Sequence, residues 1–345
     1  MRRSGGLLGA AALAGAMTIA AATSGHADPV TLRMAAIAPD GTEWARALKA
    51  YANEVETASK GELRMKWYLG GMAGDELAAL DRVKRGQLDG EAGAIFCQRL
   101  APTLRVARVP GMFESRDEFN YLMGRLKPTL DEEFRKSGFT NLGETVFGID
   151  VLFSRTPIKS LDELLAARMW AWNLDPVWQG AADAMGMKTI VTTIEEHSEA
   201  WRHKSYDAFF CVPGAALAYQ WTTETSYVAE LGATALPACL VVSNAAIDPL
   251  PNELKQVLIT TSAKFMNRFN AVSEHLDQSL VNGLLERQGL TKVQVSPQFR
   301  ARFNEAAKAA THKMGAALIA PGTIETAEKM LSEYRAAHRL EAAKR

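Results

Sequence analysis

The sequence predicts a two-lobed α/β protein with a cleft between its lobes. From residue 30 onward, strand-like and helix-like segments alternate at the spacing of βαβ units. A second run of this kind lies between apolar strands near 147–153 and 235–243, so more than one strand crosses between the two units. Two lobes joined in this way form a hinged cleft, an architecture of binding proteins and of some enzymes.

The first 27 residues have the layout of a secretory signal peptide. Arg2 and Arg3 precede an apolar run rich in Ala and Gly, and small residues up to Ala27 fit a cleavage site. The run is shorter than a membrane span of roughly 20 strongly apolar residues. We therefore expect a periplasmic protein of about 318 of the 345 residues, which suits two domains.

The charge balance argues against nucleic-acid binding. The chain has 39 Lys and Arg residues and 39 Asp and Glu residues, and the signal peptide accounts for two of the Arg. A nucleic-acid footprint would show a basic stripe, which the sequence does not have.

The first unit alternates between strands and helices. Strand 30–39 ends at a proline, and helix 40–61 has a cap at Asp40 or Thr42, an apolar stripe and a stop at Gly61. Strand 62–70, helix 74–90 and the small-residue strand 91–98 follow. This order predicts a mostly parallel sheet.

The rest of the chain continues the pattern. A helical pair is expected at 115–138 and two strands at 139–158. The second unit runs as helix 160–167, strand 168–172, helix 176–186, strand 187–193, helix 194–205 and strand 206–213. After Pro249 and Pro251, a long helix to about Arg287, a short strand at 292–296 and two final helices are expected. Lobe I is thus 28–150 with 245–290 returning to it, lobe II is 151–244, and the helices of 291–345 pack across both lobes.

No pattern of a common catalytic site is present. A GxSxG elbow, a GxxxxGK loop and a GxGxxG turn after a strand are all missing. His197 and His203 lie six residues apart on a polar helix, so they do not form a metal pair, and we expect both to be exposed. The sequence predicts no enzyme, cofactor or metal site, and an enzyme in a two-lobed scaffold is kept only as an alternative.

The three cysteines, Cys97, Cys211 and Cys239, leave at least one thiol free. We expect them to be buried as small hydrophobic residues. A disulfide between Cys97 and Cys211, or between Cys211 and Cys239, stays open because the spacing alone does not decide it.

The segment 161–180 holds three of the seven tryptophans of the chain. Trp170 and Trp172 face the same side of a strand, and Trp178 lies one turn into the next helix. The carboxyl end of a parallel strand is where α/β sheets hold ligands. Packing of these rings into the core is the competing interpretation.

Five segments stand in a characteristic order across residues 30–310. They are "LRMAAIAPDGTEWARALKAYANEVETASKGELRMKWYLGGMAGDE", "VKRGQLDGEAGAI", "VARVPGMFESRDEF", "SRTPIKSLDELLAARMW" and "EEHSEAWRHKSYDA". In this order they resemble the substrate-binding (DctP-type) subunit of tripartite ATP-independent periplasmic (TRAP) transporters. The resemblance implies a type II-like periplasmic binding protein fold with long hinge-spanning strands and C-terminal helices, and a role in capturing a solute for membrane subunits.

The sequence departs from this family where the family holds its ligand. The resemblance implies an arginine that grips a ligand carboxylate, and its place falls on Trp170. The resemblance also implies a second arginine, whose aligned position is near Asp150. Phe209 and Phe210 stand where the family has a polar segment. These changes imply a divergent branch that lacks the carboxylate-binding arginine and works with a periplasmic tetratricopeptide-repeat partner.

We therefore expect a bulky, largely apolar or aromatic ligand. Burying a ligand carboxylate without a partner costs several kcal/mol, whereas buried apolar surface contributes roughly 25 cal/mol per Å2. The expected ligand-binding residues are Trp44, Phe96, Asp150, Trp170, Trp172, Asn173, Trp178, Phe209 and Phe210.

Other readings of the same residues stay open. The nearest alternative is an organic acid held by a different arginine, for which Arg99, Arg155 and Arg168 are the candidates. Delivery of the ligand to a sensor is another alternative. The polar surface of the C-terminal helix predicts a monomer.

Overall fold

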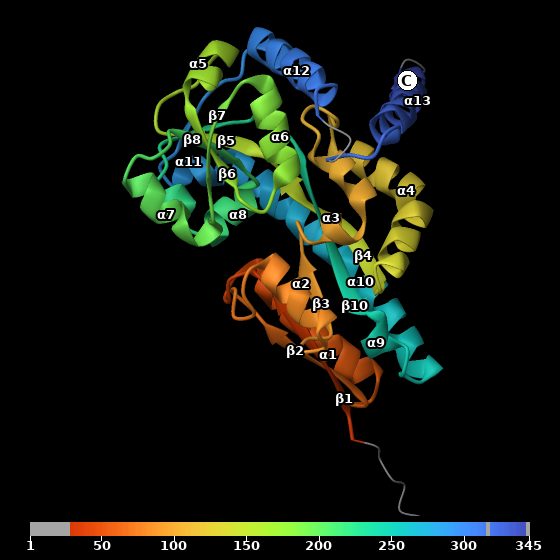
Figure 1. The fold of residues 1–345 in the computed structure, drawn as a ribbon. Helices are drawn as coiled ribbons and strands as arrows, with labels where there is room; N and C mark the ends of the chain where they lie inside the picture. Colours follow the sequence, from red (N-terminus) through yellow and green to blue (C-terminus); the bar gives the residue numbers. More distant parts are fainter. Residues whose placement is uncertain (1–27, 315–317, 343–345) are drawn as a thin grey trace, which may run out of the picture.

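The computed structural model describes residues 28–314 and 318–342. Two β-sheets form the centres of two lobes, which lie in the lower and the upper left parts of Figure 1. The predicted signal peptide, residues 1–27, lies outside the described residues. No helix in the described ranges is long and apolar enough to cross a membrane.

The first sheet has five strands in the order β2-β1-β3-β10-β4. They are β1 (Val30–Ala36), β2 (Leu63–Tyr68), β3 (Gly90–Gly93), β4 (Phe139–Ile149) and β10 (Ala235–Ser243). β1 is parallel to β2 and β3, and β10 is antiparallel to β3 and β4. Helices α1 (Glu43–Ala58) and α2 (Glu76–Lys84) begin at side-chain caps from Thr42 and Asp75.

The second sheet has six strands in the order β11-β9-β5-β8-β6-β7. They are β5 (Val151–Ser154), β6 (Arg168–Trp172), β7 (Lys188–Thr192), β8 (Ala208–Cys211), β9 (Tyr227–Ala229) and β11 (Thr291–Lys292). The helices of this part are α5 (Leu161–Ala166), α6 (Pro176–Met185), α7 (Ile194–Arg202) and α8 (Pro213–Ala218), with the short η2 (Trp221–Thr223). Both sheets are mixed rather than mostly parallel, because the crossing strands β5 and β10 run antiparallel to neighbours.

Asp150 is the single residue between β4 of the first sheet and β5 of the second. Its backbone N–H donates to the carbonyl of Thr234 at 2.9 Å, and its carbonyl accepts from Ala233 N–H at 3.3 Å. Ala233 and Thr234 directly precede β10, which returns to the first sheet. The two crossing segments are therefore paired with each other where they pass between the sheets.

Several elements differ from the expectation. Helix 74–90 is shorter than expected, because α2 ends at Lys84 and Gly90 begins β3, and strand 91–98 is shorter because β3 ends at Gly93. Residues 115–138 were expected as a helical pair, but α4 (Arg116–Lys136) is one helix that contains Pro128. Before it come α3 (Cys97–Leu100) and η1 (Pro102–Arg108). Ser115 caps the start of α4 by accepting a hydrogen bond from Glu118 N–H. The helix continues through Pro128 because apolar residues on both sides of the proline are buried on one face.

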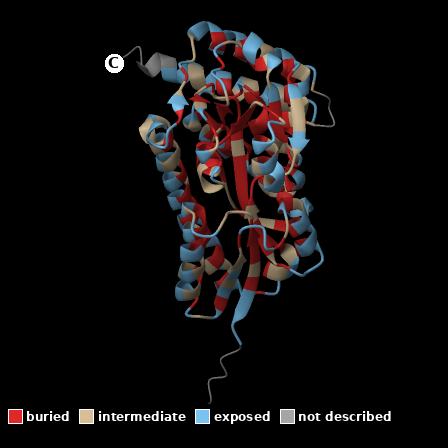
Figure 2. Cartoon of the chain, turned by 90° about the vertical axis from the view of Figure 1, so that its left-hand side faces the viewer, coloured by how far each residue is buried: buried red, intermediate tan, exposed pale blue. Residues whose placement is uncertain are grey.

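The C-terminal part contacts both sheets. It comprises α9 (Asn244–Ile247), α10 (Asn252–Ser279), η3 (Leu280–Leu284), α11 (Leu285–Arg287), α12 (Pro297–Thr311) and α13 (Thr323–Ala342). α10 packs on β4 and α1, α12 packs on α6 and α5, and α13 packs on α4. Figure 2 shows buried residues running along both lobes. The lobe boundaries expected from the sequence stay a prediction.

The cysteine expectation needs a correction. Cys97 and Cys239 form a disulfide, and Cys211 is a buried free thiol. Neither of the two disulfides left open from the sequence is the one that forms. The cause is the sheet pairing, because Cys239 of β10 lies opposite Gly93 of β3, close to the start of α3.

Candidate functional site

A cavity that is partly open to solvent is bordered by residues of both sheets. Most of its wall is apolar. Its aromatic residues are Trp44, Phe147, Trp170, Trp172, Trp178, Phe210, Tyr219, Trp221, Phe265 and Phe269, and its charged residues are Glu76, Arg108, Asp150 and Asp175. Such a cleft, with many apolar contacts and a few polar groups, is the usual form of a small-molecule site.

The side chains of the two tryptophans of β6 differ in burial and in hydrogen bonding. The Trp170 indole N–H donates to Thr192 Oγ1 at 2.8 Å, and its ring packs edge-on against Trp221 with centroids 5.5 Å apart. Trp170 is buried, whereas Trp172 is half-buried and borders both this cavity and a second, more polar one. Trp170 is thus held in place as part of the cavity wall, and Trp172 lies between the two cavities.

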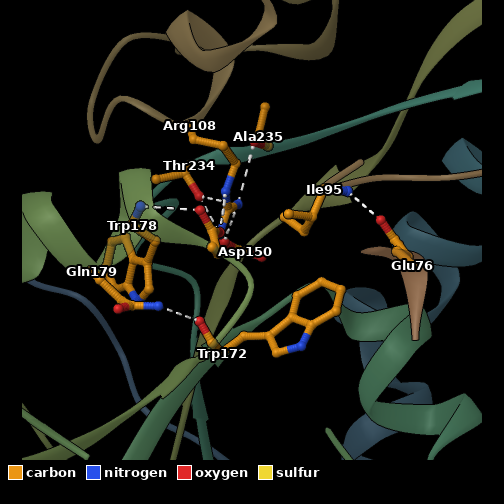
Figure 3. Close-up of polar contacts among 10 residues, drawn as sticks. Glu76, Ile95, Arg108, Asp150, Trp172, Trp178, Gln179, Thr234 and Ala235 are labelled. Carbon is orange, nitrogen blue, oxygen red and sulfur yellow. Dashed lines mark hydrogen bonds and ion pairs between the residues drawn. The ribbon is translucent and has the colours of Figure 1, made fainter. Parts of the chain in front are cut away.

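Arg108, the last residue of η1, places a guanidinium in the cavity wall. Its Nη1 donates to Asp150 Oδ2 at 2.7 Å and to Thr234 Oγ1 at 2.5 Å. Its Nε donates to Asp175 Oδ2 at 2.8 Å, and Nη2 lies 2.6 Å from the same oxygen. The side chains of the three charged residues are at most 6% exposed. Figure 3 shows Arg108 beside Asp150 and Thr234.

The electrostatic balance of this group is set by its two carboxylates. Burial alone would lower the pKa of Arg108, but the charges and hydrogen bonds of Asp175 and Asp150 outweigh it, so the pKa is raised. The guanidinium therefore stays charged. With one cation against two carboxylates, the ionised group offers an incoming anion much less attraction than an unpaired arginine would.

Glu76, the first residue of α2, supplies another buried carboxyl at the cavity. Its Oε1 accepts from Ala94 N–H at 3.0 Å, and its Oε2 accepts from Ile95 N–H at 2.5 Å and Phe96 N–H at 3.0 Å. Burial raises its pKa to about 7, and the backbone hydrogen bonds counteract part of that rise. Figure 3 shows the bond to Ile95.

The structure brings together most of the residues expected to bind ligand. Trp44, Asp150, Trp170, Trp172, Trp178 and Phe210 line the cavity, and Asn173 lines the second, more polar one. Phe96 and Phe209 are fully buried and are not among the lining residues. Phe209 stacks on Phe153, its partner in the neighbouring strand β5, on the face of the sheet opposite to Phe210, which lines the cavity.

The three arginines named for an acid ligand all lie outside the cavity lining. Arg168 forms a two-pronged, exposed ion pair with Asp207. Arg155 lies over the Trp201 ring at 3.7 Å, and Arg99 is exposed on α3.

Arg108, Asp175 and Glu76 are the functional candidates that the sequence analysis did not single out. The sequence feature that could have indicated this site is Arg108 itself, because it is an arginine among the apolar residues of 106–109. A buried arginine needs carboxylate partners, and Asp150 was already a candidate. The sequence gives no sign that Asp175, a helix cap before Pro176, also faces this arginine.

The expectation of an exposed His197 is wrong. Its ring is stacked on Trp221 with centroids 3.6 Å apart and meets the edges of Trp170 and Phe209. Within the described part of the chain neither ring nitrogen has a hydrogen-bond partner, and burial lowers the pKa of His197 to about 3. His197 is therefore a neutral ring that supports the aromatic wall from behind, while His203 is exposed as expected. No group of metal-binding side chains is found within the described ranges.

Solved structures share this fold over most of the chain. A TRAP solute-binding protein of Haemophilus influenzae with bound L-gulonate has a TM-score of 0.80 at 14% identity, covering 88% of this chain and 99% of that one. The sugar acid binding protein of Advenella mimigardefordensis with galactonate has a TM-score of 0.82 at 16% identity, covering 89% and 99%. A Bordetella pertussis extracytoplasmic solute receptor that binds pyroglutamic acid has a TM-score of 0.77 at 19% identity, covering 87% and 99%.

No curated protein matches the chain. The family model described as "Bacterial extracellular solute-binding protein, family 7" matches residues 34–317, which include the cavity-lining residues and all of both sheets except the first residues of β1. The two sheets, the cleft between them and this match together show that the chain belongs to the DctP family of extracellular solute-binding proteins, the solute receptors of TRAP-type transporters.

Proposed function

We propose that this receptor binds an organic acid whose larger part is apolar or aromatic. The apolar part of the proposal is carried by the cavity wall, where aromatic rings far outnumber charged side chains. Burying apolar ligand surface there contributes roughly 25 cal/mol per Å2. The acid part is supported by the structural relatives, which bind pyroglutamic acid, L-gulonate and galactonate.

Arg108 is the residue proposed to receive the acid group. It is the guanidinium that lines the cavity among the described residues. Asp150 and Asp175 share its charge, so the ionic contribution to binding is smaller than an unpaired arginine would give. Apolar contact then carries most of the affinity, and small hydrophilic acids are expected to bind weakly.

An uncharged apolar ligand is the second candidate. The observation that favours it is the same pairing of Arg108 with two carboxylates, which discourages a further anion. The acids bound by the relatives favour the first candidate over this one.

Matched pairs of an aromatic acid and its primary amide separate the two candidates. Phenylacetate against phenylacetamide, and 3-phenylpropanoate against its amide, keep the ring and replace only the charged group. Titration calorimetry on the full mature chain should show tighter binding of the acids. Equal or tighter binding of the amides would transfer the proposal to the uncharged ligand, and binding of gluconate alone would reject both candidates.

We also propose that the receptor is exported by its N-terminal segment and delivers its ligand to TRAP membrane subunits. The family assignment supports both steps. The tetratricopeptide-repeat partner and the monomeric state stay predictions from the sequence.

A further inference from the structure

We propose that Glu76 is a second polar anchor in the cavity, which accepts a hydrogen bond from a hydroxyl or amino group of the ligand. The inference deepens the proposed function and rests on it, because it concerns the same cavity. It adds a ligand feature: a hydrogen-bond donor at a distance from the acid group.

The geometry leaves Glu76 able to take a ligand. Its Oε2 accepts two backbone N–H groups, those of Ile95 and Phe96, whereas Oε1 accepts the single N–H of Ala94 among the described residues. A carboxylate oxygen accommodates two hydrogen bonds, so Oε1 retains a site for one more donor. Glu76 is 1% exposed and lines the cavity, so a donor that reaches Oε1 must come from within the cavity.

The residue beside Glu76 keeps this oxygen accessible. Gly93 also lines the cavity, and a Cβ on it would lie 2.8 Å from Glu76 Oε1 and 2.9 Å from the carboxyl carbon. Any larger residue at position 93 would therefore cover the oxygen. The pKa of Glu76, raised to about 7 by burial, means that both its ionised and its protonated form are accessible near neutral pH, and each can accept a hydrogen bond.

Glu76 and the Arg108 group define two separate polar points in an apolar cavity. In the view of Figure 3, Asp150 lies to the upper left of the Trp172 indole and Glu76 to its upper right. A ligand that uses both points has an acid group at one end, a flat apolar body along Trp172 and a donor at the other end. Hydroxylated or aminated aromatic acids have this chemistry.

The test uses pairs of probes that differ only in the donor. The pairs are 4-hydroxybenzoate and benzoate, 4-hydroxyphenylacetate and phenylacetate, and 3-(4-hydroxyphenyl)propanoate and 3-phenylpropanoate, each also as its primary amide. The protein is the full mature chain, as wild type and as Glu76→Gln. Glu91→Gln is the matched control, since Glu91 is an equally buried carboxyl of β3 that does not line the cavity.

Wild-type protein should bind the hydroxylated member of at least one pair tenfold or more tightly, which is the range of a hydrogen bond to a charged group. Glu76→Gln should remove this preference, and Glu91→Gln should keep it. Since Glu76→Gln also disturbs the contacts with 94–96, the wild-type preference and the melting temperature of each variant are measured first.

Equal binding within every pair by the wild type would overturn the inference and leave the proposed function standing. If the protein binds the hydroxylated amides more tightly than the amides without a hydroxyl, and binds none of the acids, the role of Glu76 is supported and the acid proposal is rejected. Failure of all probes would reject both.

Discussion

Arg108 and Asp175 form a buried ion pair between the two lobes, with Nη2 of one 2.6 Å from Oδ2 of the other. Arg108 ends η1, which packs on β10 of the first sheet. Asp175 caps α6 and accepts a hydrogen bond from the Trp178 N–H at 3.1 Å. Because Arg108 also contacts Asp150 between the sheets, one guanidinium ties a lobe, the crossing segment and the opposite lobe together.

Replacing Arg108 should destabilise the protein strongly. Arg108→Met leaves two carboxylates buried without their cation, a situation that costs about 3–5 kcal/mol. Urea denaturation measures the loss. Arg168→Met, which breaks an exposed pair with Asp207, is the control and should change the free energy of unfolding by about 1 kcal/mol or less.

The triple variant Arg108→Met, Asp150→Asn, Asp175→Asn removes all three charges at once. It should recover most of the stability lost in Arg108→Met, because no uncompensated charge stays buried. If the single and triple variants unfold at the same urea concentration, the charge argument is wrong.

The two tryptophans of β6 should separate stability from binding. Trp170→Ala removes a buried ring that packs on Trp221, and should lower the free energy of unfolding by about 3–5 kcal/mol. Trp172→Ala removes a half-buried ring at the cavity and should mainly weaken binding of aromatic acids, by about tenfold or more. Denaturation and titration calorimetry measure the two effects; a Trp172→Ala protein with unchanged affinity would place the ligand elsewhere.

The sequence was sufficient for the main elements of the fold. The cap of α1 and the alternation of β6 are local signals, and the structure has these two elements close to the expected bounds, whereas α2 ends at Lys84 rather than at Gly90. The helical pair predicted at 115–138 is instead the single helix α4, whose buried apolar face extends across Pro128.

The contacts of the site depend on pairings that local patterns do not contain. The Cys97–Cys239 bond links residues 142 apart and depends on the register of β10 against β3. Arg108 likewise contacts Asp150, Asp175 and Thr234, which lie in separate segments of the chain. Trp170, Trp172 and Trp178 could be identified because their density in 161–180 is visible in the chain itself, whereas nothing in the sequence distinguishes Glu76 from an ordinary first-turn acid of a helix.

Stability should fall as the pH rises from about 4 to 7. Burial raises the pKa of Glu76 and of Asp277 to about 7, and raises that of Glu91 well above its usual range. In this window the folded chain binds more protons than the unfolded chain, so each unit of pH lowers the free energy of unfolding. For Glu76 alone the change is on the order of 3 kcal/mol.

Thermal unfolding from pH 4 to pH 8 measures this slope. Glu91→Gln should make it shallower, because in this window the buried Glu91 carboxyl, which has no hydrogen-bond partner among the described residues, keeps its proton in the folded chain and loses it in the unfolded chain. Below pH 4 the trend should reverse, as groups such as Asp207, whose pKa is lowered by the hydrogen bond from Arg168, lose their charge. A melting temperature that rises steadily from pH 4 to pH 8 would contradict the assignment.

Reduction of the disulfide should lower the melting temperature. The Cys97–Cys239 bond closes a long loop of the unfolded chain and should contribute about 2–5 kcal/mol to stability. The melting temperature with and without dithiothreitol measures the effect. Cys211→Ala should respond to dithiothreitol as the wild type does, whereas Cys97→Ser should not respond; an equal response of both variants would exclude this pairing.

The most direct test of the ligand class is the identity of the molecule that the protein carries. The full chain is expressed with export, purified without denaturation, then unfolded, and the released small molecules are identified by mass spectrometry. The account predicts an organic acid with an aromatic or bulky apolar body and a hydroxyl or amino group distant from the acid. Release of only a small hydrophilic acid, such as a sugar acid without apolar surface, would contradict it.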